Sequence, residues 1–176
     1  MTKKVKYAII GCGSFGGMHI EALLQTKDIE ITGLCDVHMD FVKEKNEKYS
    51  LGAKCYTDYN EMLSEVEADI VVVATADHAH KGATVAALKA GFNVLCEKPL
   101  CVNAKEAEAL SLCAKKNNVF LMEAMWTRFI PAIICSQELV ESGAIGDVRG
   151  IEAAFCYASS PEEEAKLRAN DILYKE

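Results

Sequence analysis

The sequence predicts a doubly wound α/β fold whose central sheet is parallel. From residue 5 to residue 123, short runs rich in β-branched residues alternate with longer segments of helical pattern, which is typical of consecutive βαβ units. Several of the short runs are continuously apolar, as strands are when helices cover both faces of a sheet. A glycine-rich turn directly after the first run is the third indication of this fold class.

Six strands and five helices are expected in this first domain, residues 1–123. The predicted strands span residues 5–10, 30–36, 53–56, 70–75, 93–97 and 119–123. The predicted helices span residues 15–26, 39–49, 59–64, 80–90 and 104–116. Asn103 is placed to cap the N-terminus of the last helix, and Gly91 to end the fourth.

We expect a second domain to begin after residue 123 and to be truncated. Residues 129–142 are predicted to form a helix, and residues 148–157 alternate between apolar and polar side chains as a strand does. The chain then enters a charged stretch, in which no partner strand for residues 148–157 is visible. We therefore expect residues 124–176 to be the start of an incomplete second α/β domain.

The composition is that of a globular protein and excludes several functional classes. Of 176 residues, 51% are hydrophobic and 26% are charged, and the net charge of -7 has the wrong sign for neutralising nucleic-acid phosphates. The apolar run near the N-terminus is too short for a signal peptide, and no apolar stretch reaches the roughly 18 residues of a membrane span. We expect a cytoplasmic protein that binds neither nucleic acid nor membrane.

Eight cysteines raise the question of disulfides or zinc. No two have the C-x-x-C spacing of structural zinc sites and redox motifs, and most lie among Val, Ile, Leu and Ala. His78 and His80 are two residues apart, which is not the i, i+4 spacing of a helical metal pair. We expect reduced, mainly buried cysteines and no metal site.

The motif Gly11-Cys12-Gly13-Ser14-Phe15-Gly16 has the G-x-G-x-x-G pattern between a predicted strand and a predicted helix. In a dinucleotide-binding turn the first glycine allows the tight turn, the second lets the backbone approach a pyrophosphate, and the third lets helix and strand pack closely. Free N–H groups at the helix N-terminus attract the anion. The motif therefore predicts a Rossmann-type sheet with cofactor contacts from Gly11 through Gly16. The alternative is a strand-to-helix turn without a ligand.

Asp36 ends the second predicted strand, twenty residues after Gly16. A carboxylate there can accept hydrogen bonds from ribose hydroxyls and repels a 2′-phosphate, so NAD is the favoured cofactor. NADP stays open as the alternative, because His38 in its cationic form could lie near a 2′-phosphate.

The ends of the fourth and fifth predicted strands carry further candidates. Thr75 and His80 lie at the carboxyl edge of the sheet, where open α/β sheets bind their ligands. Glu97-Lys98-Pro99 follows the fifth strand, and a lysine beside a nicotinamide could assist proton loss from a substrate hydroxyl. From position alone, a solvated surface lysine is the alternative for Lys98.

Three segments together resemble the Gfo/Idh/MocA oxidoreductases. GCGSFGGMH is similar to the opening dinucleotide loop of that family, and VVVATADHAHKGATVAALKAGFNVLCEKPL to its central block, which ends in an EKP motif. LMEAMWTRFIPA is similar to the following strand and turn in the branch that contains dihydrodiol and D-xylose dehydrogenases. The resemblance covers nearly the whole chain.

This resemblance implies hydride transfer between a nicotinamide and a secondary alcohol of a sugar, polyol or cyclic diol. By motif match Lys98 is the catalytic residue and Glu97 lies near the cofactor. Trp126 and Arg128 match positions near the nicotinamide end of the cleft, the alternative being a core tryptophan and a surface arginine. We also expect a homo-oligomer, because the incomplete second domain leaves apolar surface exposed.

The chain departs from the family in two respects. Thr75-Ala76-Asp77 stands where the family often has Thr-Pro-Asn, which places an anion near the cofactor. Family members also continue into a longer second domain with a second proton-transfer residue, His or Tyr, which has no counterpart here. We therefore expect cofactor binding with weak or no turnover. The alternatives are a non-catalytic dinucleotide-binding module or partner subunit, and an N-terminal portion of a longer protein.

Overall fold

The computed structural model describes residues 3–154, 156 and 160–162. The chain divides into two units, residues 1–125 and residues 126–176. The boundary predicted from the sequence, after residue 123, lies two residues earlier. Each unit is described by itself.

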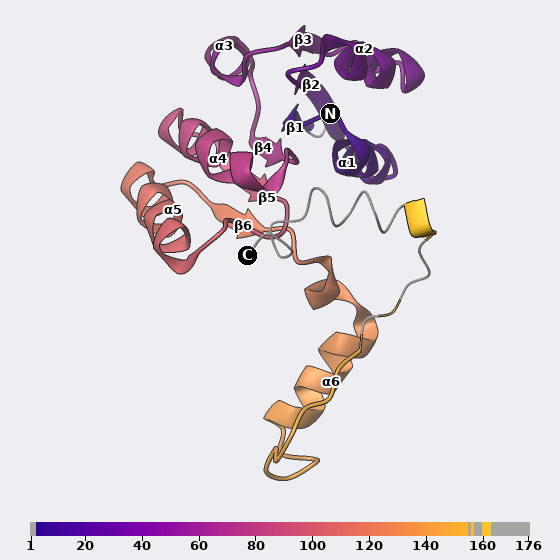
Figure 1. Ribbon diagram of the computed structural model, residues 1–176, viewed down its shortest axis with the longest axis vertical. Helices are drawn as coiled ribbons and strands as arrows, with labels where there is room; N and C mark the ends of the chain where they lie inside the picture. Colours follow the sequence, from indigo (N-terminus) through magenta and orange to yellow (C-terminus); the bar gives the residue numbers. More distant parts are fainter. Residues whose placement is uncertain (1–2, 155, 157–159, 163–176) are drawn as a thin grey trace. The chain divides into compact units, whose positions relative to one another are not determined.

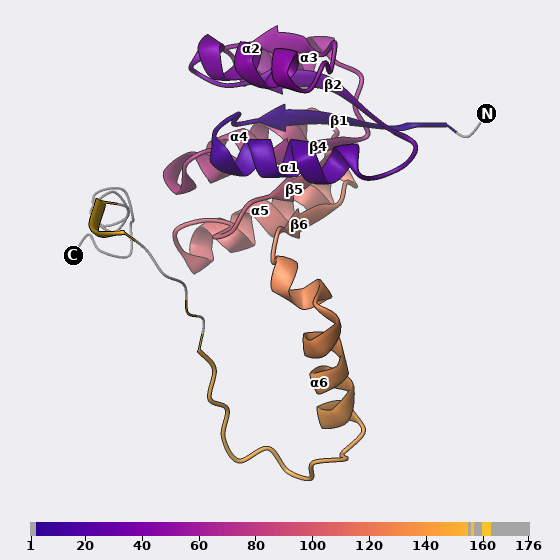
Figure 2. The same cartoon turned by 90° about the vertical axis from the view of Figure 1, so that its right-hand side faces the viewer.

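The first unit is a six-stranded sheet in which each neighbouring pair of strands is parallel. The strands are β1 (Val5–Ile10), β2 (Ile29–Cys35), β3 (Lys54–Tyr56), β4 (Ile70–Val73), β5 (Asn93–Cys96) and β6 (Leu121–Glu123). The helices are α1 (Ser14–Leu24), α2 (Met39–Lys48), α3 (Tyr59–Glu65), α4 (His80–Lys89) and α5 (Ala104–Asn117), with a 3₁₀ turn η1 (Asp77–Ala79). The strand order β3-β2-β1-β4-β5-β6 is that of a Rossmann sheet, as predicted. Figure 2 shows the strands one below the other from β2 to β6.

Two hydrophobic cores fill the two faces of the sheet, because alternate side chains of each buried strand point to opposite sides. Helices α1 and α2 cover one face, and α3, α4 and α5 cover the other (Figure 1). The core under α1 and α2 includes Ile9, Ile20, Leu34, Val42 and Val72. The core under α3, α4 and α5 includes Ile10, Met62, Val71, Val73, Leu88, Val94 and Leu110. Continuously apolar strands are thus explained by burial on both faces.

The predicted helix ends are largely confirmed by local contacts. The Asn103 side chain accepts a hydrogen bond from the Glu106 N–H at 3.0 Å and caps α5. Gly91 follows Ala90, the C-cap residue of α4. Its φ of +89° is a left-handed conformation that glycine adopts without strain. The strand predicted over residues 70–75 ends at Val73, and η1 was not predicted.

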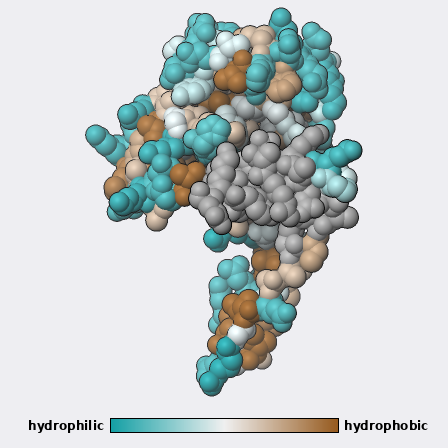
Figure 3. Space-filling model, in the orientation of Figure 1, coloured by the Kyte–Doolittle hydropathy of each residue, from teal (hydrophilic) through white to brown (hydrophobic). Residues whose placement is uncertain are grey.

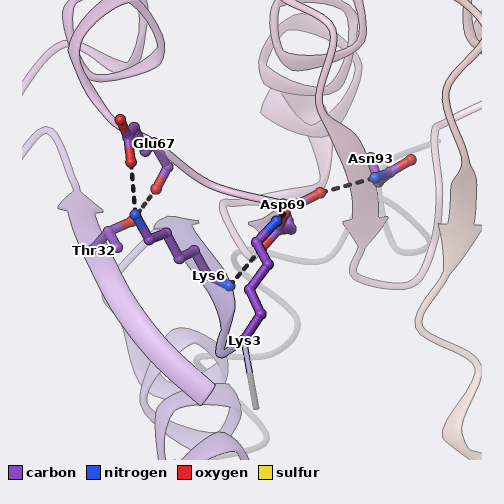
Figure 4. Close-up of polar contacts among 6 residues, drawn as sticks. All are labelled: Lys3, Lys6, Thr32, Glu67, Asp69 and Asn93. Atoms are coloured by element: carbon purple, nitrogen blue, oxygen red, sulfur yellow. Dashed lines mark hydrogen bonds and ion pairs between the residues drawn. The ribbon is translucent and has the colours of Figure 1, made fainter. Parts of the chain in front are cut away.

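Polar contacts hold the amino ends of the strands (Figure 4). The Lys6 backbone N–H donates to the Asp69 carboxylate at 2.8 Å, and the Lys6 ammonium pairs with Glu67 at 2.6 Å. The Asn93 amide donates to the Asp69 carbonyl oxygen at 2.9 Å. Thr32, the extra residue where the β1–β2 register shifts, donates its hydroxyl to the Glu67 carbonyl oxygen at 2.9 Å. The turn before β4 is thereby tied to β1, β2 and β5.

The second unit contains a 3₁₀ turn η2 (Trp126–Phe129) and the helix α6 (Pro131–Glu141). The helix was predicted, and Pro131 occupies its first turn, where the missing N–H costs nothing. Every described residue from 131 to 154 is exposed, and apolar side chains gather along α6 in Figure 3, among them Ile133, Ile134, Leu139 and Val140.

The strand predicted for residues 148–157 is not observed. Residues 148–154 and 156 have no regular secondary structure, while Phe155 and Tyr157 lie outside the described residues. A strand is stabilised by pairing with a neighbour, and alternation of side chains alone does not supply one. Among the described residues, no helix combines the length and the apolar character needed to cross a bilayer.

The described cysteines are unpaired thiols. Cys12, Cys35 and Cys96 are buried, and burial raises the pKa of each to about 12, so they are protonated and unreactive at neutral pH. The expectation of buried cysteines holds for these three, and Cys55, Cys101 and Cys113 are partly buried. It is wrong for Cys135 and Cys156 of the second unit, which are exposed.

Candidate functional site

The carboxyl ends of the strands form one edge of the sheet. Register places the last residues of five strands in a row, in the order Cys35, Ile10, Val73, Cys96 and Glu123. The loops that follow these residues carry almost all of the predicted site residues. Open α/β sheets bind their ligands in the crevice outside this edge.

Two glycines of the first loop are required by close packing. Gly11 has φ +98°, and a Cβ there would lie 2.4 Å from the carbonyl oxygen of Ala74. A Cβ on Gly16 would lie 1.9 Å from the carbonyl oxygen of Gly11. Both distances are far below van der Waals contact, so a side chain at either position would push the loop away from β4 or α1 away from the loop.

Gly13 is different, because the structure around it leaves room. Its φ of -69° is ordinary for any residue, and a Cβ there would meet no atom within 4 Å. Gly13 precedes α1, whose first N–H groups have no partners inside the helix and whose first turn contains no acidic residue. The open face, the amide groups and the positive end of the helix dipole together suit an anion such as a pyrophosphate.

Asp36 fixes this loop from the neighbouring strand. Its Oδ2 accepts a hydrogen bond from the Cys12 backbone N–H at 2.8 Å, and its Oδ1 accepts one from the His38 N–H at 2.9 Å. Each carboxylate oxygen has two acceptor positions, so both keep one for a further donor such as a ribose hydroxyl. The half-buried carboxylate therefore fits the role predicted for it.

His80 connects the loops after β4 and β5. The ring is 1% exposed; its Nδ1 lies 2.7 Å from the Pro99 carbonyl oxygen and its Nε2 lies 3.0 Å from the Thr75 carbonyl oxygen. Both oxygens are acceptors, so a ring with two N–H groups satisfies both contacts and a neutral ring satisfies one. These contacts give His80 a bridging position, while its predicted contact with a cofactor stays a prediction.

The turn after β5 is held by carboxylates as well. Glu97 Oε2 accepts a hydrogen bond from the Lys98 N–H at 3.1 Å, and Glu123 at the end of β6 accepts one from the Leu100 N–H at 2.8 Å. The peptide bond between Lys98 and Pro99 is cis. Together with the contact from His80, these bonds fix the backbone on both sides of Pro99.

Glu97 also contacts helix α1. Its Oε1 lies 2.8 Å from His19 Nε2, and the two side chains are 13% and 18% exposed. A carboxylate only accepts hydrogen bonds, so Nε2 is the donor. Burial alone would raise the pKa of Glu97, but the hydrogen bonds from His19 and from the Lys98 N–H outweigh burial and lower it.

Lys98 is exposed, and its Nζ lies 4.9 Å from the centre of the Phe15 ring. This distance is within the range of a cation–π contact. Phe15 belongs to the glycine motif, so the ammonium lies beside the loop that the sequence predicts to bind a dinucleotide.

The structure thus gathers ten of the predicted residues at one edge: Gly11, Gly13, Ser14, Phe15, Gly16, Asp36, Thr75, His80, Glu97 and Lys98. Trp126 and Arg128 lie on η2, in the other unit, and are both exposed. Sequence reasoning missed His19 and Glu123 as parts of this site. The signals that could have found them are the helical spacing of His19 from Phe15 and the place of Glu123 at the end of a strand.

Comparison with known proteins identifies the same region. Residues 5–125 match the GFO_IDH_MocA family, an oxidoreductase family with an NAD-binding Rossmann fold. A trans-1,2-dihydrobenzene-1,2-diol dehydrogenase of Xenopus tropicalis is 32% identical over 152 residues, which are 85% of this chain and 46% of that protein. A D-xylose 1-dehydrogenase (NADP(+)) of Hypocrea jecorina is 41% identical over 119 residues, 68% of this chain and 30% of that protein. The chain spans less than half of the length of either relative.

Solved structures give the same result. An oxidoreductase from Agrobacterium radiobacter in complex with NAD+, L-tartaric acid and magnesium superposes with a TM-score of 0.76 at 25% identity, over 82% of this chain and 42% of that chain. GenD2 from gentamicin A biosynthesis, in complex with NAD, superposes with a TM-score of 0.75 at 26% identity, over 82% and 41%. The resemblance drawn from the motifs is confirmed. By its match over residues 5–125, the chain belongs to the Gfo/Idh/MocA oxidoreductase family with an NAD-binding Rossmann fold.

Proposed function

We propose that residues 1–125 bind NAD(H) at the carboxyl edge of the sheet. The observation that carries the proposal is the open face at Gly13 beside the Asp36 carboxylate. Gly13 lets the amide groups of α1 approach a pyrophosphate, and Asp36 has acceptor positions for the ribose hydroxyls. Asp36 would repel a 2′-phosphate, so NADP(H) is the weaker ligand, kept as an alternative because one relative is named for NADP(+).

The proposed reaction is hydride transfer between the nicotinamide and a secondary alcohol. NAD(H) supplies the hydride chemistry when bound. In the oxidation of the alcohol, Lys98 Nζ would accept the hydroxyl proton, and in the reverse reaction it would donate that proton. This atom is exposed and lies beside the glycine loop. The remaining residues of this unit proposed on the cofactor side are Gly11, Ser14, Phe15, Gly16, Thr75, His80 and Glu97. For Trp126 and Arg128 of the other unit, the place near the nicotinamide stays a prediction from the motif match.

The substrate class we propose is a sugar, a polyol or a cyclic diol. Support comes from the names of relatives, which include dihydrodiol, D-xylose and inositol dehydrogenases. We propose hydride transfer on this class of substrate as the activity of the protein, by analogy with these relatives. For the 176 residues in hand we propose weak or no turnover, since they span less than half of the length of those relatives.

Calorimetric titration of the purified chain tests the proposed cofactor. Titration with NADH should show one saturable site, and titration with NADPH should show clearly weaker binding. A Lys98→Met variant should bind NADH as well as the parent chain, because Lys98 is assigned to the substrate proton. Absence of binding by both nucleotides would contradict the proposal, and steady NADH production from a tested polyol would contradict the expected weak turnover.

We also propose that the chain associates with itself. Ile133, Ile134, Leu139 and Val140 leave an apolar surface on α6 whose side chains are each at least 40% exposed. Exposed apolar surfaces of this kind favour association. Light scattering over a concentration series should show a mass that rises with concentration, and a constant monomer mass would contradict this proposal.

A further inference from the structure

Helix α1 presents two neighbouring side chains to the Glu97-Lys98 dipeptide. Phe15 and His19 are four residues apart, so they lie on the same face of the helix, one turn after the other. Phe15 contacts the Lys98 ammonium, and His19 donates to the Glu97 carboxylate. Two consecutive residues of the loop after β5 are therefore each held by one residue of the same helix.

The contact between His19 and Glu97 is well protected from water. The two side chains are 18% and 13% exposed, and the distance of 2.8 Å is that of a strong hydrogen bond. Glu97 uses its other oxygen to accept the Lys98 backbone N–H. The Glu97 carboxylate thus contacts His19 with one oxygen and the Lys98 backbone with the other, so it connects His19 to the backbone from which the Lys98 side chain extends.

The contact between Phe15 and Lys98 is more exposed. Phe15 is 47% exposed and Lys98 lies at the surface, so a cation–π contact alone would not hold the long lysine side chain in one place. The backbone next to this side chain has contacts of its own, from the Lys98 N–H to Glu97 and from His80 to the Pro99 carbonyl oxygen. A chain of two hydrogen bonds thus connects His19 to Glu97 and Glu97 to the Lys98 backbone.

We propose that His19 and Phe15 are positioning residues that fix the Lys98 ammonium beside the glycine loop. The inference rests on the proposed function in that Lys98 is the proton-transfer group there. His19 acts through Glu97 and Phe15 acts directly on the ammonium. Because both residues belong to the helix whose N-terminus is proposed to receive the pyrophosphate, the lysine and the cofactor loop share one rigid support.

The test measures the position of the Lys98 ammonium without requiring turnover. Reductive methylation with ¹³C-formaldehyde converts lysines to dimethyl-lysines, which keep their charge and give one methyl signal each in a ¹H–¹³C spectrum. A Lys98→Arg variant identifies the Lys98 signal by its disappearance. Methyl groups above an aromatic ring are shifted upfield, so the Lys98 signal should lie upfield of the other lysines, and Phe15→Leu should remove this shift.

His19 is tested by three variants of the same chain. His19→Ala should remove most of the upfield shift of the Lys98 signal, whereas His19→Gln, whose side-chain amide can still donate to Glu97, should keep most of it. His78→Ala is the matched control, because His78 is an exposed histidine on η1, and it should leave the signal unchanged. A cooperative thermal unfolding transition and an unchanged remainder of the spectrum establish that the variants are folded.

The proposal is overturned if the parent chain shows no upfield Lys98 signal, or if His19→Ala leaves that signal in place while Phe15→Leu moves it. NADH titration of the same samples separates this inference from the proposed function. Loss of the shift in His19→Ala without NADH binding by any sample would uphold the positioning role and refute the cofactor. NADH binding with a Lys98 signal insensitive to His19 would uphold the cofactor and refute the positioning role.

Discussion

The two edges of the sheet are both rich in polar contacts, but they are built differently. At the amino edge, the half-buried Lys6 ammonium pairs with the exposed carboxylate of Glu67, and the Lys6 backbone N–H donates to the Asp69 carboxylate. At the carboxyl edge, half-buried or buried side chains bind backbone groups of the loops, as Asp36 does for the Cys12 N–H and His80 for the Thr75 carbonyl oxygen.

This difference shows what each edge is for. Exposed ion pairs contribute little free energy. Buried side chains that bind loop backbone fix geometry, and their loss leaves polar groups unsatisfied. The loops of the carboxyl edge are held in this way by Asp36 and His80, while open space remains at Gly13. Loops of fixed geometry around an open surface are suited to ligand binding.

The largest difference in stability should be seen between two variants that each change one glycine to alanine, at Gly16 and at Gly13. Gly16→Ala would put a methyl group 1.9 Å from the Gly11 carbonyl oxygen, and we expect it to lower the free energy of unfolding by about 4 kcal/mol or more. Gly13→Ala meets no atom within 4 Å and should leave stability nearly unchanged but weaken NADH binding. Urea denaturation and calorimetry measure the two effects. Equal stability losses in the two variants would contradict the packing described here.

His80→Ala should cause the second-largest loss of stability. The change removes the buried imidazole that bridges the carbonyl oxygens of Thr75 and Pro99, at a cost of about 1–3 kcal/mol for a buried group left unsatisfied. Urea denaturation measures the loss, and His78→Ala, at an exposed histidine nearby, should change stability by less than about 0.5 kcal/mol. Similar values for the two histidines would show that the bridge carries no stability.

Asp36→Asn should change cofactor choice. An amide keeps the shape of the side chain but loses the charge that attracts ribose hydroxyls and repels a 2′-phosphate. Its NH2 group also cannot accept one of the two backbone N–H bonds, from Cys12 and His38, that the carboxylate accepts. We expect NADH to bind about tenfold more weakly, which is roughly 1.4 kcal/mol, and the preference for NADH over NADPH to narrow. Calorimetric titrations with both nucleotides measure this. A preference that stays the same would remove Asp36 as the selecting residue.

Glu97 should make the carboxyl edge sensitive to acid. Its pKa is lowered below the ordinary value of 4.5, so its contribution to stability is present above that value and is lost as the pH falls through the lowered pKa of the folded state. The difference in unfolding free energy between the parent chain and Glu97→Gln should therefore shrink as the pH is lowered below about 4.5. A difference that is independent of pH would show that the carboxylate is not stabilised by His19 and the Lys98 N–H.

The smallest effect is expected at the amino edge. Lys6→Met removes an ammonium that pairs with the exposed carboxylate of Glu67, while the backbone bond of residue 6 to Asp69 is kept. The thermal unfolding midpoint should move little, and NADH binding should not change. Weakened NADH binding in this variant would show that the two edges are coupled.

Local patterns were sufficient for much of the fold and for the glycine loop. Apolar periodicity predicts the six strands and five helices, and the spacing of the glycines predicts the turn between β1 and α1. Both depend on residues close together in the sequence, and both predictions hold. His19 and Glu123 were missed because their partners, Glu97 and Leu100, are distant in sequence and meet them through the packing of α1 and the register of β6. The strand predicted at 148–157 was wrong because pairing, and not alternation, makes a strand.

The central claim is that the carboxyl edge receives a dinucleotide and the amino edge does not. The most direct test is to record ¹H–¹⁵N spectra of the chain during titration with NADH. The account predicts that the amide signals of Gly13, Ser14 and Phe15 and of the residues after Asp36 move saturably, while those of Lys6 and Asp69 stay in place. Signals that do not move at the glycine loop, or that move mainly at the amino edge, would contradict it.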